Sequence, residues 1–165
     1  MKGRYLVLAV FVVLAILAYF YFHPSEEKKI KKQLALLSEY ASNDRGESTF
    51  ALARRLDHMG ALFADRVDLK ASGYELSGTH TRREIVHLAA RAGMAFSQMT
   101  LKFHDVSVAI SGEGMAKVSA TGRFKGMSAK GESVDEVQDL ELTFRKGGEG
   151  RWLITAVEGV EVLKK

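Results

Sequence analysis

Cysteine is absent from this chain, and proline occurs only once, at Pro24. Without cysteine the chain has no disulfide, no thiolate nucleophile, no sulfur ligand for zinc and no lipidated N-terminal cysteine. A single proline excludes a proline-rich linker. The chain also lacks the Gly-x-x-x-x-Gly-Lys loop of many nucleotide-binding proteins and the Gly-x-Ser-x-Gly turn of many hydrolases. These absences exclude several large classes of enzyme.

The excess of positive charge is small and local. The 165 residues hold 24 Lys and Arg against 20 Asp and Glu, for a net charge of +4. Lys2 and Arg4 lie near the N-terminus, and a basic collar follows at Lys28, Lys29, Lys31 and Lys32. Because the remainder is slightly acidic, we expect no nucleic-acid partner. The collar is better suited to anionic lipid headgroups, at roughly 1 kcal/mol per basic residue near the surface.

An unbroken apolar run of 18 residues extends from Tyr5 to Phe22. As a helix it would span roughly 27 Å, close to the thickness of the bilayer's hydrocarbon core. Tyr5 stands at one end and Tyr19 and Tyr21 at the other, where aromatic rings favour the membrane interface. A cleaved signal peptide is the alternative, but it normally ends in a small-x-small site, and this run ends in bulky residues. We therefore expect a short tail and transmembrane anchor in residues 1–24 and a separate domain in residues 25–165.

The orientation of this single-pass anchor is open, because basic residues flank the run on both sides. The lysine count alone would keep the domain in the cytoplasm. A very short N-terminal tail more often stays inside while the rest of the chain is exported. We expect the anchor in an inner (cytoplasmic) membrane, with the domain on the periplasmic side.

Apolar residues at helical spacing predict three helices after the anchor. The first begins after Ser25 and ends before the turn-rich segment 42–46, and the second extends through Phe63. The third begins at Thr81, which has the spacing of a capping box with Glu84. Between the second and third helices we expect a strand over 66–76, bent at Gly73, and then a turn over 77–81.

From Thr100 onward the apolar period changes to two, which predicts an antiparallel meander of four strands. Hairpin turns are expected at 111–114 and 146–150, with a longer link over 125–133. A phase shift at His104 and Asp105 indicates a β-bulge. Helices that precede and interrupt the strands predict an α+β fold: a curved, mainly antiparallel sheet covered by three helices.

Three segments resemble the nuclear-transport-factor-2-like (NTF2-like) superfamily, also called SnoaL-like or ketosteroid-isomerase-like. They are the glycine turn and helix start at 76–86, the strand at 137–146, and Gly150-Arg-Trp-Leu-Ile154. The resemblance covers about 25–163 and implies a cone with a pocket between the helices and the concave face of the sheet. It also implies dimers formed through the outer face of the sheet. Because this fold hosts isomerases, dehydratases, hydrolases and binding proteins, it does not by itself indicate an activity.

Enzymes of this superfamily use Asp, His and Tyr within the cone, so such residues are our pocket candidates. Tyr40 loosely resembles the family's oxyanion-binding tyrosine. His104 and Asp105 are neighbours on a strand and point to opposite faces, unless the bulge turns one of them. Glu136 and Gln138 share a face with apolar neighbours, so they must be solvated or hydrogen-bonded, which would suit a wet pocket mouth.

We expect no catalytic residues, no metal and no cofactor. Glu84 and His87 have the spacing of a carboxylate metal site, but such sites in helical folds need two copies of that motif. The first hypothesis is a non-enzymatic module that binds a protein or a small apolar ligand, in an envelope complex. The inner-membrane scaffold proteins of type IV secretion resemble this architecture. An isomerase, dehydratase or hydrolase, and a structural homodimer, are the alternatives.

Overall fold

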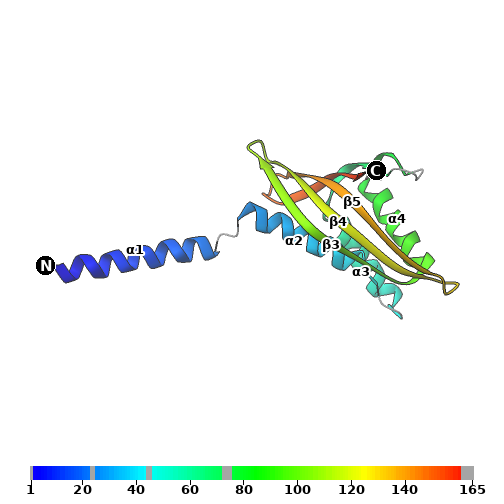
Figure 1. Cartoon of the computed structure of the whole chain (residues 1–165), viewed down its shortest axis with the longest axis horizontal. Helices are drawn as coiled ribbons and strands as arrows, with labels where there is room; N and C mark the ends of the chain where they lie inside the picture. The colour runs from blue at the N-terminus through cyan, green and yellow to red at the C-terminus, as the bar shows by residue number, and fades with distance from the viewer. Residues whose placement is uncertain (1, 23–24, 44–45, 72–75, 161–165) are drawn as a thin grey trace, which may run out of the picture.

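The computed structural model describes residues 2–22, 25–43, 46–71 and 76–160. Its helices are α1 (Lys2–Phe22), α2 (Glu26–Tyr40), α3 (Thr49–Gly60) and α4 (Arg82–Ala95). Its strands are β1 (Phe63–Lys70), β2 (Gly78–Thr81), β3 (Phe96–Ser111), β4 (Met115–Ser128), β5 (Ser133–Lys146) and β6 (Trp152–Val160). The elements form the expected α+β fold, in which α2, α3 and α4 lie along a strongly curved sheet (Figure 1).

The sheet is mixed and has six strands in the order β2-β1-β6-β5-β4-β3. The predicted meander from β3 to β6 is confirmed, because each of these strands pairs antiparallel with the next. β1 instead joins β6 in parallel, which makes the sheet mixed. The segment expected as a turn at 77–81 is in part a strand, since Gly78–Thr81 pairs with β1. Its four residues carry no apolar alternation, so the pattern could not indicate a strand.

Two other boundaries differ from the expected ones. The second helix ends at Gly60 rather than at Phe63, which is buried in β1. A side chain at Gly60 would stand 2.9 Å from the Val86 side chain, so glycine permits close approach of α3 to α4. The link over 125–133 is shorter than expected, because β4 continues to Ser128. The expected bend at Gly73 falls outside the described residues.

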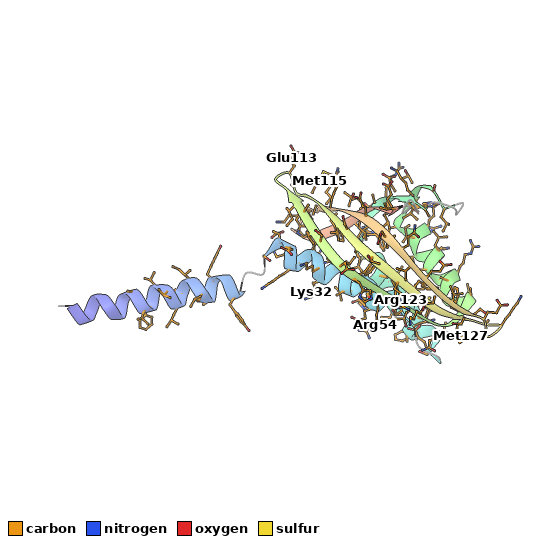
Figure 2. The ribbon with its side chains drawn as sticks, viewed as in Figure 1. Lys32, Arg54, Glu113, Met115, Arg123 and Met127 are labelled. Carbon is orange, nitrogen blue, oxygen red and sulfur yellow. The ribbon has the colours of Figure 1, made fainter. Side chains whose placement is uncertain are left out.

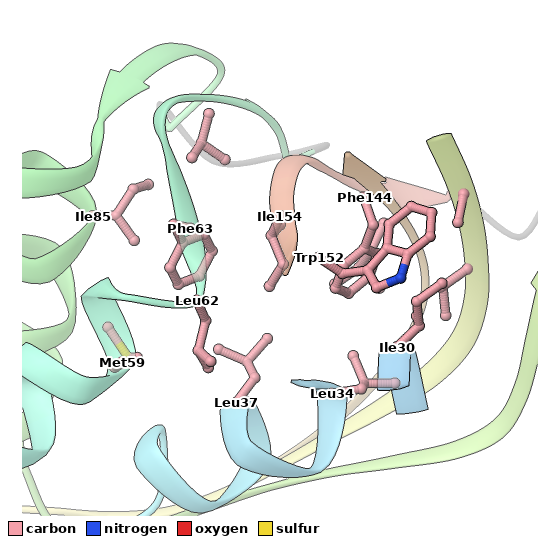
Figure 3. Packing of buried hydrophobic residues seen from close by; sticks show 14 of the residues in the cluster. Ile30, Leu34, Leu37, Met59, Leu62, Phe63, Ile85, Phe144, Trp152 and Ile154 are labelled. Atoms are coloured by element: carbon pink, nitrogen blue, oxygen red, sulfur yellow. The ribbon is translucent and has the colours of Figure 1, made fainter. Parts of the chain in front are cut away.

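The core lies between the helices and the concave face of the sheet. Its most deeply buried large side chains are Trp152, Phe144, Ile30, Leu142, Ile154, Val67 and Val118. Ile30 and Leu34 of α2 lie on the side of Trp152, and Leu37 points toward Leu62 and Ile154, as Figure 3 shows. Among the described residues, none of those fully buried is polar or charged. Hydrophobic burial therefore stabilises this interface, at about 25 cal/mol per Å² of apolar surface.

α1 extends away from the domain (Figure 1). The large apolar side chains described along it, from Val10 to Tyr21, are between 49% and 85% exposed. Counting only the described residues, no helix is both long and apolar enough to cross a membrane.

Candidate functional site

A groove of about 440 Å³ lies between α2 and β3, at the edge of the sheet. We call it the edge groove. It is lined by Lys31, Leu34, Ala35, Ser38, Lys102, Phe103, His104 and Val106. Two of these, Lys102 and His104, point to the outer face of the sheet, where Arg123 is labelled in Figure 2. The groove therefore connects the helical side of the domain with its outer face.

Hydrogen bonds from the end of α2 fix one end of the edge groove. The Ser38 hydroxyl donates to the Leu101 carbonyl, and the Leu101 amide donates to the Ser42 hydroxyl at 3.0 Å. Asn43 forms a bridge with Met99, through backbone N–H···O contacts of 2.9 and 3.3 Å. These contacts occupy backbone groups that an edge strand would otherwise expose.

Beyond these contacts, the predicted bulge at His104 and Asp105 is confirmed. Three steps along β3, from His104 to Ser107, match two steps along β4, from Thr121 to Ser119. Asp105 has a φ of 52°, in the left-handed region that few residues other than glycine, Asn and Asp adopt. A bulge bends its strand, and this one lies where His104 and Val106 line the groove.

The edge groove combines an apolar wall with cationic groups. Phe103 and Val106 are half-buried and supply apolar surface, whereas Leu34 is only 2% exposed. Lys31 forms an ion pair of 2.6 Å with Glu27. Among the described residues, Lys102 and His104 have no hydrogen-bond or ion-pair partner, and both are exposed. The charge of Lys102 is therefore available to a ligand.

A second hollow, of about 340 Å³, lies on the outer face and shares Lys102 and His104 with the edge groove. Its other cations are already paired. Arg123 makes two hydrogen bonds to the Asp135 carboxylate, at 2.9 and 2.7 Å, and Lys125 lies 3.7 Å from the same group. The Arg123 guanidinium lowers the pKa of Asp135, and Asp135 raises the pKa of Arg123.

Tyr40 lies elsewhere, at the end of α2 next to α3. Its ring stacks on His58 with centroids 5.7 Å apart. Its backbone carbonyl accepts a hydrogen bond from Arg55, which also pairs with Glu47 at 2.9 Å. These contacts give Tyr40 a packing role between the two helices.

Glu136 and Gln138 lie on β5 opposite Phe124 and Gly122, on the face that also carries Leu140 and Leu142. Glu136 is exposed, whereas Gln138 is half-buried. A side chain placed on Gly159 would collide with the Gln138 amide, so Gln138 covers this glycine. The candidates thus lie in three places: Tyr40 beside α3, His104 and Asp105 at the bulge, and the β5 pair on the concave face.

The most strongly shifted carboxyl group is one that sequence reasoning did not select. Hydrogen bonds from Lys29, Lys146 and Trp152, in that order of effect, lower the pKa of Glu26 to about 2. The Trp152 indole N–H donates to the Glu26 carboxylate at 2.7 Å, across 126 positions of sequence. The sequence indicated a helix start at this glutamate but carried no signal for its distant partners.

No group of three or more His, Asp or Glu side chains that could hold a metal ion occurs in the described part of the chain. His87 lies on the exposed face of α4. Glu84 is held by Thr81, whose backbone N–H donates to its carboxylate at 2.7 Å. This hydrogen bond lowers the pKa of Glu84 and completes the capping box predicted for the third helix.

Comparison with solved structures gives the fold of the domain. A candidate dehydratase of the NTF2-like family from Streptomyces avermitilis has a TM-score of 0.64 at 16% identity, over 85% of this chain and 99% of that one. A candidate scytalone dehydratase from Novosphingobium aromaticivorans has a TM-score of 0.65 at 15% identity, over 84% and 85%. An NTF2-like protein with a cystatin-like fold from the same species has a TM-score of 0.63 at 16% identity, over 93% and 90%.

No protein-family model and no curated protein sequence matches the chain. Because the similar structures are at most 16% identical, they show the fold alone. The domain has the NTF2-like fold that its sequence resembles.

Proposed function

We propose that the chain is a non-enzymatic binding module of NTF2-like fold, held at a membrane by the apolar run of its sequence from Tyr5 to Phe22. The observation that carries the proposal is the composition of the core between the helices and the concave face of the sheet. Its fully buried members, such as Trp152, Phe144 and Leu142, are all apolar among the described residues. General acid–base catalysis needs a titratable group within hydrogen-bond reach of the substrate.

The pKa values of the described groups also favour a binding role. Catalytic acids and bases are commonly shifted toward neutrality by burial in a cleft. Here the shifted carboxyl groups are Glu26, Glu84 and Asp135, and each pKa is lowered by hydrogen bonds. A lowered pKa keeps a carboxylate charged and structural. It does not prepare the group to donate a proton at neutral pH.

The membrane part of the proposal rests on the apolar run from Tyr5 to Phe22 and on the exposure of its apolar side chains in α1. Such a surface is unfavourable in water and favourable in hydrocarbon. The basic collar of α2 then begins near the membrane surface, where it would contact anionic headgroups. In this arrangement the domain lies on the periplasmic side of an inner membrane.

Two measurements on the full chain in a bacterial host test this location. Alkaline carbonate should leave the chain in the membrane pellet, and phosphatase fused after Lys165 should be active. A control fusion to residues 25–165 alone should be soluble and inactive. An inactive fusion to the full chain would overturn the periplasmic orientation, and release by carbonate would overturn the anchor.

A second candidate function, a small-molecule dehydratase or isomerase, is favoured by two similar structures that carry dehydratase names. Its best-placed acid is Glu136, on the concave side of β5. Carbon-13 NMR of the glutamate carboxyl groups separates the two functions. A Glu136 pKa raised toward neutrality would support an enzyme, and an ordinary pKa would support the binding module.

The partners that we propose are a second copy of the chain or another envelope protein. Sedimentation of the full chain in nanodiscs, with one or two copies counted per disc, tests the homodimer. Single copies at micromolar concentration would overturn it. Photo-crosslinking in cells from Val137, an exposed residue of β5 outside both hollows, then tests for another envelope protein.

A further inference from the structure

We propose that the edge groove binds a single-chain anionic amphiphile, an alkyl group that carries one carboxylate. The proposal rests on the binding role given above and places that role outside the cone. Side chains inside the cone pack closely against two glycines of β4. A β-carbon at Gly126 would lie 2.7 Å from the Phe96 ring, and one at Gly122 would lie 2.7 Å from the Leu140 side chain. These contacts leave no room for a ligand beside Gly122 and Gly126.

The size and the wall of the edge groove fit an alkyl chain. Its volume of about 440 Å³ lies within the usual range of ligand sites, roughly 300–1,000 Å³. Phe103 and Val106, which are half-buried, supply apolar surface, and the small Ala35 leaves open space on the α2 side. Each methylene group buried there would contribute about 0.8 kcal/mol.

The charge of the rim fits a carboxylate. Lys102 stands at the rim without an ion-pair partner among the described residues, and His104 lies two positions along the strand. Lys31 is a second cation, but it is paired with Glu27. Three acidic groups lie nearby: Asp105 is exposed at the bulge, Asp135 is held by Arg123 and Lys125, and Asp139 accepts a hydrogen bond from Thr121, the residue opposite His104. Lys102 is thus the unpaired cation of the rim among the described residues, and its charge favours an anion over a cation of equal length.

The Ser38 hydroxyl lies in the same groove, but it already donates to the Leu101 carbonyl. The groove consequently offers apolar contact and charge rather than a set of directed hydrogen-bond donors. Such a site recognises a class of amphiphiles by chain and charge, not one molecule by its detailed shape.

The test uses the full chain in phosphatidylcholine nanodiscs and dodecanoate that carries a photoreactive diazirine, below its aggregation concentration. After illumination, mass spectrometry measures labelling of the peptides that contain α2 and β3. Unlabelled dodecanoate should compete, and dodecyltrimethylammonium, with the same chain and the opposite charge, should compete at least about tenfold less well. If dodecanoate and dodecyltrimethylammonium compete equally well, the preference of the groove for an anion is wrong.

Matched variants separate the edge groove from the rest of the surface. Ala35→Trp fills the groove and should lower labelling about tenfold, whereas Ala53→Trp, at an exposed alanine of α3, should not. Lys102→Gln should lower affinity about three- to fivefold, whereas Lys117→Gln, an exposed lysine outside the groove, should not. If Ala35→Trp leaves the labelling unchanged, the edge groove is not the binding site.

Two further outcomes have distinct meanings. Competed labelling confined to residues that face the cone would overturn the edge groove and leave the binding role standing. A nanodisc phospholipid with a diazirine on its acyl chain should not label α2 and β3. If it does so as strongly as dodecanoate, the ligand is a bilayer lipid rather than a free single-chain amphiphile, and the proposal fails.

Discussion

At the scale of single residues, Glu26 is the most consequential polar group of the domain. Its carboxylate accepts from Lys29 at 2.8 Å, from Lys146 at 3.0 Å and from the Trp152 indole at 2.7 Å. Glu26→Gln removes the charge that both lysines need. We expect a loss of about 1 kcal/mol in the free energy of unfolding, a modest value because the group is half-buried. Urea unfolding followed by the fluorescence of Trp152, the chain's one tryptophan, measures it.

Glu27→Gln is the matched control, because Glu27 is exposed and, among the described residues, pairs only with Lys31, one turn away. Its effect should stay within about 0.5 kcal/mol. An equal effect of the two substitutions would show that the long-range contacts of Glu26 contribute nothing.

The pH dependence follows from the same carboxylate. The pKa of Glu26 falls from 4.5 to about 2 on folding, so its contribution to stability is complete above pH 4.5. It is lost as the pH falls through the folded-state pKa. The difference in unfolding free energy between the wild type and Glu26→Gln should therefore be constant at pH 5 to 7 and shrink toward pH 2. A constant difference down to pH 2 would contradict the lowered pKa.

Gly126 gives a second prediction at this scale. A β-carbon here would lie 2.7 Å from the Phe96 ring and 3.1 Å from the Phe124 ring, and these rings pack edge to face. Gly126→Ala should cost about 1–3 kcal/mol, because both rings must move. At Gly112 a β-carbon would have no neighbouring atom within 4 Å, so Gly112→Ala should change the free energy of unfolding by less than about 0.5 kcal/mol. Thermal unfolding of both variants compares them.

At the scale of elements, the bulge in β3 combines local strain with the candidate binding site. Asp105 tolerates its φ of 52° better than most residues, but glycine tolerates it at no steric cost. Asp105→Gly should raise stability by up to about 1 kcal/mol, and Asp105→Val should lower it by at least as much. Urea midpoints measure both changes. If valine were accepted without loss, the strained backbone would be absent in solution.

The sequence best predicted the elements in which apolar residues recur at regular spacing on one face. Ile30, Leu34 and Leu37 mark one face of α2, and all three are buried. The alternation of Leu140, Leu142 and Phe144 similarly indicated β5. β2 was missed because its strand character comes from pairing with β1, and no pattern within Gly78–Thr81 records that partner. Phe63 continued the helical period of α3, but the chain turns into β1 first.

The candidate site was harder to predict than the fold. His104 and Asp105 were selected as candidates for the pocket of the cone because of their residue types, and the bulge that carries them lies at the edge groove instead. The opposite wall of the groove comes from α2, whose residues Lys31 and Ala35 are about 70 positions away in sequence. Helical periodicity shows which residues of α2 share a face, but it does not show against which strand that face packs. The groove between α2 and β3 therefore could not be predicted from the spacing of residues.

At the scale of the whole molecule, α1 should be separable from the domain. The described core residues come from α2, α3, α4, the sheet and the turn at Leu62, and none comes from α1. Deleting residues 1–24 should therefore change the free energy of unfolding by less than about 0.5 kcal/mol and make the chain soluble without detergent. Urea titration of the shortened chain beside the full chain checks this. Loss of a cooperative transition would show that α1 is part of the fold.

Glu26 has a mechanical consequence because of where it stands. Only three residues separate the end of α1 from the start of α2, so any force on α1 enters the domain almost at Glu26. There the carboxylate joins the first turn of α2 to Lys146 and to Trp152, at the centre of the core. A force applied to α1 is thus transmitted through Glu26 to β5 and β6. The contacts of Glu26 with Lys146 and Trp152 must break before α2 can separate from the sheet.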